Sequence, residues 1–471
     1  MEEIEDILEE NELAARFEQM LASGKQAYFD VDDLVVLIDH YMALPNIEMA
    51  QEVLNFAEKF YPDSNFVKLQ RIRMFFYEGD DEFALKMFDA MEPSESDLEN
   101  LDFLLDKADM AFLLNRFDMA ITLCKNILKM EPECTDAYIQ LCFNYHAQDR
   151  YEEFLETFVQ LMAIDDSHEN LMFDFSFNFQ IKNQYLPAKS LFEKLTEIYP
   201  LSKIAWFCLG VSQSALNLHQ EAITSFEFCL SLDEEFAGAY FNLANVYHTM
   251  QNYPKAIELY HKTFEFESPD ALAYSYIGEC YLSLEKTDDA FDAFKKARDL
   301  DPELPEMLMG LALCLSEYGK FESAIHFAEK ALTIQPNHAE NVFILYELYT
   351  ENGETEKAEA LIDTFCSDSD KLISLYLDFS DILFQNDKKE LAYIILNRAQ
   401  AFYPEDYSCT YRLANYCYAE GLITEALLHL QIALEYDFVR RDIFLNYQPD
   451  IADDVQISAI LTEYEKVNNN K

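Results

Sequence analysis

Short amphipathic segments joined by polar turns follow one another along the whole chain. The stretch DALAYSYIGECYLSLEKTDDAFDAFKKARDLDP, residues 270–302, is typical. Its apolar residues recur every three or four positions in two runs, which is the period of a helix buried along one face. A polar turn separates the runs, and Asp-Pro ends the second because proline cannot continue a helix. The chain has only 9 glycines and 13 prolines in 471 residues, too few for a fold rich in β-turns. The pattern therefore predicts an all-α fold.

Alanine recurs along the chain with a period of 34 residues. Steps of 34 from Ala290 reach alanine or, once, Phe154: Ala120, Phe154, Ala188, Ala222, Ala256, Ala324, Ala358, Ala392 and Ala426. A two-residue insertion in MEPSESDLEN shifts the grid, which continues at Ala84 and Ala50. A fixed period of this length indicates tandem helix pairs. We expect twelve pairs, starting near residues 31, 65, 101, 135, 169, 203, 237, 271, 305, 339, 373 and 407.

Other positions of the grid explain how such pairs could pack. Leu or Ile, followed by Gly or Ala, recurs in the first run of many units, as at Leu209-Gly210 and Ile277-Gly278. An aromatic residue or leucine follows the grid alanine by four positions, as at Phe226. Small residues let two helix backbones approach, and large ones fill the space beside them. One helix pair cannot bury its apolar face alone, so each pair is expected to pack against the next pair.

The set Tyr274, Ile277, Gly278, Tyr281, Ala290, Phe294, Ala297 and Pro302 resembles the tetratricopeptide repeat. So does the spacing of Trp206, Leu209, Gly210, Ala222 and Phe226. The resemblance covers about residues 31–440. It implies an α-solenoid superhelix, with the first helix of each pair lining a concave face. Residues 1–30 are expected to form an N-terminal capping helix, and residues 441–471 a C-terminal capping helix and tail.

Some units depart from the family's pattern. Lys68 and Arg71 stand where apolar residues belong, and we expect a shifted register in that first helix. Phe154 replaces the packing alanine.

The resemblance places the second, fifth, ninth, twelfth and thirteenth positions of each unit in the concave groove. At the fifth and ninth positions of consecutive units, a stripe of apolar residues includes Ile139, Phe143, Phe173, Phe177, Phe207 and Phe241. Acidic residues stand at other ninth positions, among them Glu279, Glu347 and Asp381, whereas Arg73 is the one basic residue there. We predict a peptide-binding groove that is apolar in the middle and acidic at its flanks. Asn242 and Asn245 add possible hydrogen bonds to a peptide backbone. The alternative is that the phenylalanines only fill core between units.

The chain is strongly acidic. It carries 88 Asp and Glu against 34 Lys and Arg, a formal net charge of −54. Such a surface repels nucleic acid and anionic membranes and favours partners with basic segments. The acidity could also serve solubility alone. The ten cysteines form no C-x-x-C pair, which suits a reducing compartment. Neither a signal peptide nor an apolar run long enough to span a membrane is recognisable, so we expect a cytoplasmic protein.

No pattern of catalytic chemistry stands out. Phosphate-binding loops, nucleophile elbows and H-E-x-x-H are absent from the sequence, and the nine histidines are scattered. We therefore predict no enzyme activity, no cofactor and no metal site. The leading hypothesis is a scaffold that binds basic or apolar protein segments in its groove. The alternative is an adaptor or regulatory subunit of one machine, such as an envelope, secretion or cell-cycle assembly, that uses its convex face and caps. An enzyme with an unrecognised site among the helices is a third possibility.

Overall fold

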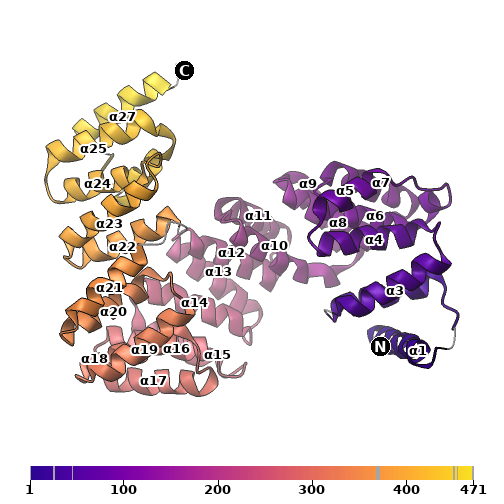
Figure 1. Ribbon diagram of the computed structural model, residues 1–471, viewed down its shortest axis with the longest axis horizontal. Helices are drawn as coiled ribbons and strands as arrows, with labels where there is room; N and C mark the ends of the chain where they lie inside the picture. Colours follow the sequence, from indigo (N-terminus) through magenta and orange to yellow (C-terminus); the bar gives the residue numbers. More distant parts are fainter. Residues whose placement is uncertain are drawn as a thin grey trace. The chain divides into compact units, whose positions relative to one another are not determined.

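The computed structural model describes residues 2–24, 27–44, 46–366, 372–448, 451–452 and 454–468, with side chains described from residue 11 to residue 466. All regular elements within these residues are helices, which confirms the predicted all-α fold (Figure 1). The chain divides into two compact units, residues 1–232 and residues 233–471. Within each unit, antiparallel helix pairs stack in chain order as an α-solenoid.

Unit 1 begins with α1 (Glu2–Ser23) and continues as six helix pairs. The first helices of the pairs are α2 (Val31–Ala43), α4 (Asn65–Tyr77), α6 (Leu101–Leu113), α8 (Thr135–Ala147), α10 (Leu171–Ile181) and α12 (Lys203–Ala215). The second helices are α3 (Ile47–Phe60), α5 (Asp81–Asp89), α7 (Phe117–Met130), α9 (Tyr151–Ile164), α11 (Tyr185–Ile198) and α13 (His219–Leu232). Two short 3₁₀ helices, η1 (Asp97–Glu99) and η2 (Asp166–Asn170), precede α6 and α10.

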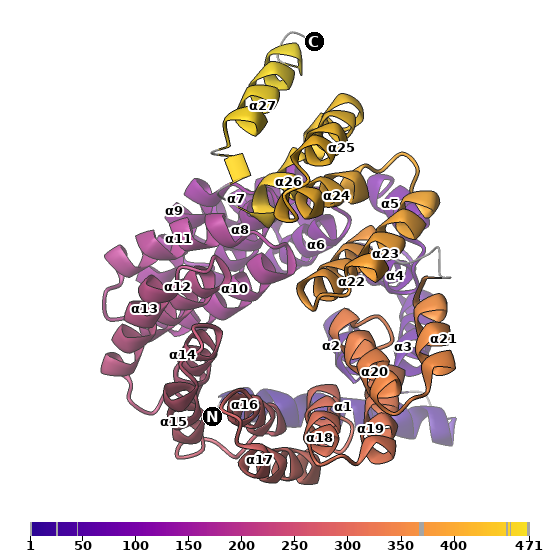
Figure 2. The same ribbon diagram turned by 90° about the vertical axis from the view of Figure 1, so that its left-hand side faces the viewer.

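Unit 2 continues the same alternation (Figure 2). Its first helices are α14 (Ala237–Thr249), α16 (Ala271–Ser283), α18 (Pro305–Glu317), α20 (Ala339–Glu351), α22 (Ile373–Gln385) and α24 (Ser408–Ala419). Its second helices are α15 (Tyr253–Thr263), α17 (Thr287–Leu300), α19 (Phe321–Ile334), α21 (Thr355–Cys366), α23 (Lys389–Phe402) and α25 (Ile423–Tyr436). After η3 (Phe438–Arg441) come α26 (Asp442–Tyr447) and α27 (Val455–Asn468).

The chain after α25 forms two more helices, which pack against the last pair. The short α26 lies against α24, and α27 lies against α25. Asn415 on α24 donates a hydrogen bond to the carbonyl of Phe444 at 2.9 Å, and Phe444 is buried. The predicted C-terminal cap therefore contains two helices. The end of the predicted tail, residues 469–471, and the side chains of residues 1–10 lie outside the described part. The division into twelve repeats with two caps stays a prediction.

The periodic alanines lie at the contacts between helices. All eleven are buried, as is Phe154, which takes the twelfth place. Phe154 is accommodated within an aromatic cluster, with its ring centroid 5.8 Å from that of Phe158 and 4.6 Å from that of Phe175. Lys68 and Arg71 lie on α4, which spans Asn65–Tyr77 and so begins where the repeat predicts. Arg71 pairs with Glu58 on α3 at 2.7 Å. In these two units, the ring of Phe154 and the salt bridge of Arg71 thus stand where other units have small or apolar residues.

One left-handed residue ends the first helix in nearly every pair. The residues with positive φ at this place are Gly79, Asn115, Asp149, Asn183, Asn217, Gln251, Glu285, Gly319, Gly353, Asp387 and Gly421. The turns are closed by a hydrogen bond across six residues, as from the amide of Lys286 to the carbonyl of Tyr281 at 2.9 Å. This is the Schellman arrangement, which satisfies the last carbonyls of a helix. The turns inside pairs therefore share one geometry.

The two-residue insertion lies in the connection between α5 and α6. Its backbone is held locally, because the amide of Ser94 donates to Asp97 at 2.7 Å and Asn65 donates to the same carboxylate at 2.6 Å. These hydrogen bonds lower the pKa of Asp97 against the effect of its burial. Ser94 and Ser96 are exposed. The insertion thus changes a connection between pairs and leaves the pairs intact.

Candidate functional site

The predicted apolar groove residues of unit 1 lie on three consecutive first helices. Ile139 and Phe143 are on α8, Phe173 and Phe177 on α10, and Phe207 on α12. All are half-buried except Phe177, which is 62% exposed.

Most of these rings also serve the packing between pairs. The rings of Phe173 and Phe207 meet edge to face at 5.7 Å, and the ring of Phe143 lies 4.9 Å from that of buried Phe175. The core-filling alternative therefore accounts for much of their surface. Phe177 is different, and Ile181, one turn further along α10, is 63% exposed beside it. The prediction did not include Ile181, although its spacing of four from Phe177 places it on the same face of the helix.

An acidic hollow adjoins this apolar face in unit 1. Its volume is about 410 Å³, and it is lined by Arg73, Asp102, Leu105, Asp106, Asp109, Asp136, Ile139 and Gln140. Arg73 pairs with Asp39 at 2.9 Å, with Asp109 at 3.2 Å and with Asp106 at 3.8 Å. Burial raises the pKa of Asp106 to about 6, with Arg73 opposing and Asp39 and Asp109 adding to the rise. Four carboxylates thus face one guanidinium in the lining.

Phe241, Asn242 and Asn245 lie on α14 in unit 2, so Phe207 and Phe241 belong to different units. The ring of Phe241 packs against Tyr260 at 5.7 Å and Tyr276 at 6.0 Å. Asn242 donates to the carbonyl of Gly238 in its own helix at 2.9 Å. The side-chain oxygen of Asn245 accepts from the hydroxyl of Tyr260 at 2.6 Å. Both amides have partners within the chain, which weakens their case as anchors for a peptide backbone.

Two of the three predicted acidic residues of unit 2 have cations of their own. Glu347 pairs with Lys388 at 3.0 Å, and Asp381 pairs with Arg412 at 3.3 Å. Tyr416 also donates to Asp381 at 2.6 Å. The groove therefore contains more cations than the residues at its ninth positions predict. The lysine and the arginine come from other positions of neighbouring pairs.

Glu279 is the exception, since no lysine or arginine of the described chain pairs with it. The Nε2 atom of His248 lies 3.9 Å from its carboxylate. Burial lowers the pKa of that histidine. Burial and then repulsion from Glu340 and Glu306 raise the pKa of Glu279 to about 7.

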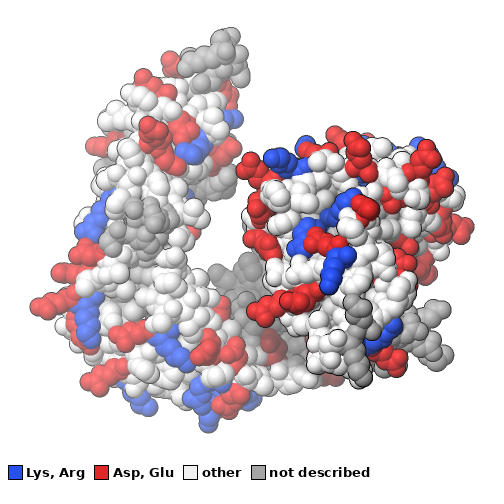
Figure 3. Space-filling model, turned by 45° about the vertical axis from the view of Figure 1, so that its right-hand side comes forward, with Lys and Arg blue, Asp and Glu red and all other residues white. Residues whose placement is uncertain are grey.

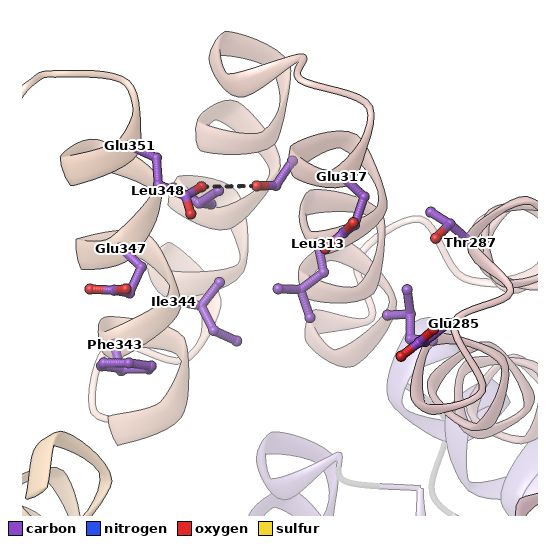
Figure 4. Close-up of a pocket in the computed structure, with 11 residues that line it drawn as sticks. Glu285, Thr287, Leu313, Glu317, Phe343, Ile344, Glu347, Leu348 and Glu351 are labelled. Atoms are coloured by element: carbon purple, nitrogen blue, oxygen red, sulfur yellow. Dashed lines mark hydrogen bonds between the residues drawn. The ribbon is translucent and has the colours of Figure 1, made fainter. Parts of the chain in front are cut away.

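A trough in unit 2 runs across α16, α18 and α20. Its volume is about 620 Å³, and its apolar lining is Leu282, Leu313, Phe343, Ile344 and Leu348. Figure 4 shows Leu313 on one helix facing Ile344 on the next, with Phe343 one position before Ile344. Ser316 donates to Glu351 across the two helices at 3.2 Å. Leu282, Leu313 and Phe343 stand at groove positions of three consecutive units, so the rule that found Glu347 could have found these three. Ile344 and Leu348 stand at other positions of their unit.

Acidic side chains predominate on the molecular surface. On the face that Figure 3 shows, Asp and Glu are spread widely, and Lys and Arg lie among them. The ten cysteines are free, and all but Cys134 are buried. Burial raises the pKa of thiols such as Cys124, to about 12. Such thiols are poor nucleophiles at neutral pH. Among the described residues, no group of three or more His, Cys, Asp or Glu side chains is placed to hold a metal ion.

Sequence models of one family match the chain in unit 2. Two tetratricopeptide repeat models cover residues 235–303 and residues 281–339. Residues 235–339 are tetratricopeptide repeats. This confirms the resemblance, and the number of repeats stays a prediction.

Curated relatives of this chain are distant. The BBSome complex member BBS4 of Bos taurus is 23% identical over 269 residues, which is 56% of this chain and 48% of that protein. The anaphase-promoting complex subunit CDC16 of Saccharomyces cerevisiae is 22% identical over 287 residues, 59% of this chain and 34% of that protein. This chain thus spans less than half the length of either relative.

The solved APC/C hetero-tetramer Cut9-Hcn1 contains a chain that is 15% identical to this one. The match covers 88% of this chain and 94% of that chain, with a TM-score of 0.39. None of the described helices is both long and apolar enough to cross a membrane.

Proposed function

We propose that this tetratricopeptide repeat protein is a non-enzymatic scaffold whose first-helix faces bind segments of other proteins. Family membership supports a role in protein interaction. The observation that carries a site in unit 1 is the exposed pair Phe177 and Ile181 on α10. Two large apolar side chains that are more than half exposed on one helix face favour a protein partner.

The acidic hollow beside this face supports a basic partner. Ile139 lines the hollow and also belongs to the apolar face on α8, α10 and α12. A segment with an apolar side chain against Phe177 could therefore place a Lys or Arg beside Asp102 and Asp136. Opposite charges at such a rim mainly increase the association rate and the salt dependence of binding.

The test compares a double variant with a control variant at an even more exposed side chain. Phe177→Ser with Ile181→Ser removes the apolar pair, and Leu201→Ser changes a side chain that is 81% exposed outside this face. We expect capture of partners from native lysate, quantified by mass spectrometry, to fall for the double variant and to persist for Leu201→Ser. Captured segments should be rich in Lys and Arg, and capture should weaken at high salt. Equal capture by all three proteins would contradict the site in unit 1.

The alternative function, an adaptor subunit that binds through second-helix faces and its ends, has support from the relatives. BBS4 is a member of the BBSome complex and CDC16 is a subunit of the anaphase-promoting complex. A chain of this class could occupy a fixed place in one assembly. Retention of a partner by variants of the first-helix faces would favour this alternative over the groove.

A further inference from the structure

We infer that the trough across α16, α18 and α20 is a second docking site, which binds an amphipathic helix of a partner protein that carries Lys or Arg on both edges of its apolar stripe. The site lies wholly in unit 2 and shares no residue with the site proposed in unit 1.

One row of carboxylates lines the trough, and a second row lies toward the start of the same helices. The row at the end where α18 and α20 begin consists of Glu306 and Glu340, with Glu279 of α16 close enough to be repelled by both. The row at the other end consists of Glu285, Glu317 and Glu351, which are all exposed (Figure 4).

These carboxylates lack internal counter-ions. In the described part of the chain, none of the six forms an ion pair with a lysine or an arginine, whereas Glu347 on the floor is held by Lys388 at 3.0 Å. The repulsion that Glu340 and Glu306 exert on Glu279 is therefore a cost that a partner's cations would relieve.

The arrangement of the rows selects a helix over a strand. A helix presents an apolar stripe with polar positions on both of its edges, so cations at those edges can reach both rows. A strand turns alternate side chains to opposite faces, so its charges would point away from the floor. Three neighbouring helices at about 8–10 Å spacing make a floor about 16–20 Å long. A partner helix of about 11–13 residues would cover it at 1.5 Å per residue.

The first experiment uses a synthetic fluorescent peptide about 16 residues long, with leucines at helical spacing and lysines on both edges of the stripe. Its binding to the full chain is followed by fluorescence anisotropy. Two matched peptides serve as controls: in one, glutamates replace the lysines, and in the other, central prolines break the helix. We expect only the helical lysine peptide to bind. Absence of binding at about 1 mM, or equal binding of the three peptides, would overturn the inference.

Paired charge reversals locate the site. Glu317→Lys with Glu351→Lys changes one row, and Glu322→Lys with Glu356→Lys makes the same charge change on the second helices α19 and α21. We expect the first pair to weaken binding roughly tenfold and the second to change it less than about threefold. Circular dichroism checks that both variants are folded. Equal effects of the two pairs would show attraction to overall charge and would refute the trough as the site.

The pH dependence of peptide binding provides a second test through Glu279, because a change in packing alone would not alter it. The ionisable groups that face it are His248 on α14, Tyr260 on α15, Tyr276 and Cys280 on α16 itself, Glu306 on α18 and Glu340 on α20. Its carboxyl loses its proton around pH 7, so the charge of its row grows between about pH 6 and pH 8. Binding of the lysine peptide should strengthen over this range, and Glu279→Gln should remove most of the increase. An unchanged pH profile in that variant would exclude Glu279 from the cation-binding row.

This inference and the proposed function fail separately. Phe177→Ser with Ile181→Ser should leave peptide binding at the trough intact, because those residues belong to unit 1. Loss of trough binding in that variant would instead mean that the peptide binds in unit 1.

Discussion

Replacement of Gly310 by alanine is expected to destabilise unit 2, although alanine favours helices. A Cβ at Gly310 would lie 2.1 Å from Cζ and 2.2 Å from Cε1 of Phe294. Carbon atoms in contact normally lie about 3.5–4.0 Å apart. The ring cannot simply retreat, because it is fully buried and Gly278 lies against it, with a hypothetical Cβ at 2.7 Å. Overpacking of this kind costs up to about 3 kcal/mol, and the helix propensity of alanine returns about 1 kcal/mol. We expect a net loss of about 2 kcal/mol.

The assay is urea unfolding followed by circular dichroism, together with hydrogen exchange of the amides of α17 and α18. Exchange is needed because arrays of repeats unfold in parts, so one midpoint can hide a local loss. In a Phe294→Leu background, Gly310→Ala should cost much less, and this gives a coupling of about 2 kcal/mol. Gly278→Ala should be milder than Gly310→Ala. A more stable Gly310→Ala protein would refute the reasoning, since helix propensity would then outweigh the contact with the ring.

The remaining predictions concern strain and charge. Gln251→Gly should stabilise the fold by roughly 0.5–1 kcal/mol in thermal melts, because Gln251 has φ of 60°; Asn217→Gly should gain less, since asparagine tolerates this region. Burial lowers the pKa of His146 to about 4. The neutral histidine therefore makes its full contribution to the free energy of unfolding above about pH 6.5, and this contribution should be lost as pH falls toward 4. Acid titration of His146→Leu should lack this step. Because the pKa of Glu279 is raised, its ionisation destabilises the fold as pH rises through about 7, and Glu279→Gln should melt higher at pH 8 but not at pH 4.

Each of these has a result that would count against it. Equal gains for Gln251→Gly and Asn217→Gly would mean that left-handed strain is not the cause. An acid step that survives in His146→Leu would assign the step to other groups. Identical melting of Glu279→Gln and the unchanged chain at pH 8 would show that the carboxylate is well solvated.

The repeat and its packing could be predicted because they depend on local spacing. Alanine at Ala290 and its equivalents marks a contact that every pair must make, and all these positions are buried. Compensation of charge could not be predicted in the same way. Lys388 and Arg412 reach Glu347 and Asp381 from 41 and 31 positions away in the chain (388 − 347 and 412 − 381), so the ninth positions alone overstated the acidity.

The sequence pattern also could not predict which side chains are exposed. Phe173 and Phe177 stand at equivalent kinds of position on α10, yet one ring meets Phe207 and the other is largely exposed. That difference depends on how neighbouring pairs are rotated against each other, which a single unit does not encode. The trough was missed for a different reason: its floor comes from three units, and two of these units contribute only one apolar side chain each.

The connection that holds the two-residue insertion offers a practical site for labels. Turns inside pairs share one left-handed geometry, so added residues there would disturb the exit of a helix. The connection at residues 92–96 already differs in length from its counterparts, and its backbone is held by Asp97 and Asn65. A fluorophore or an affinity tag introduced at exposed Ser96, with Asp97 kept, should report on unit 1 without changing the stacking of its helices.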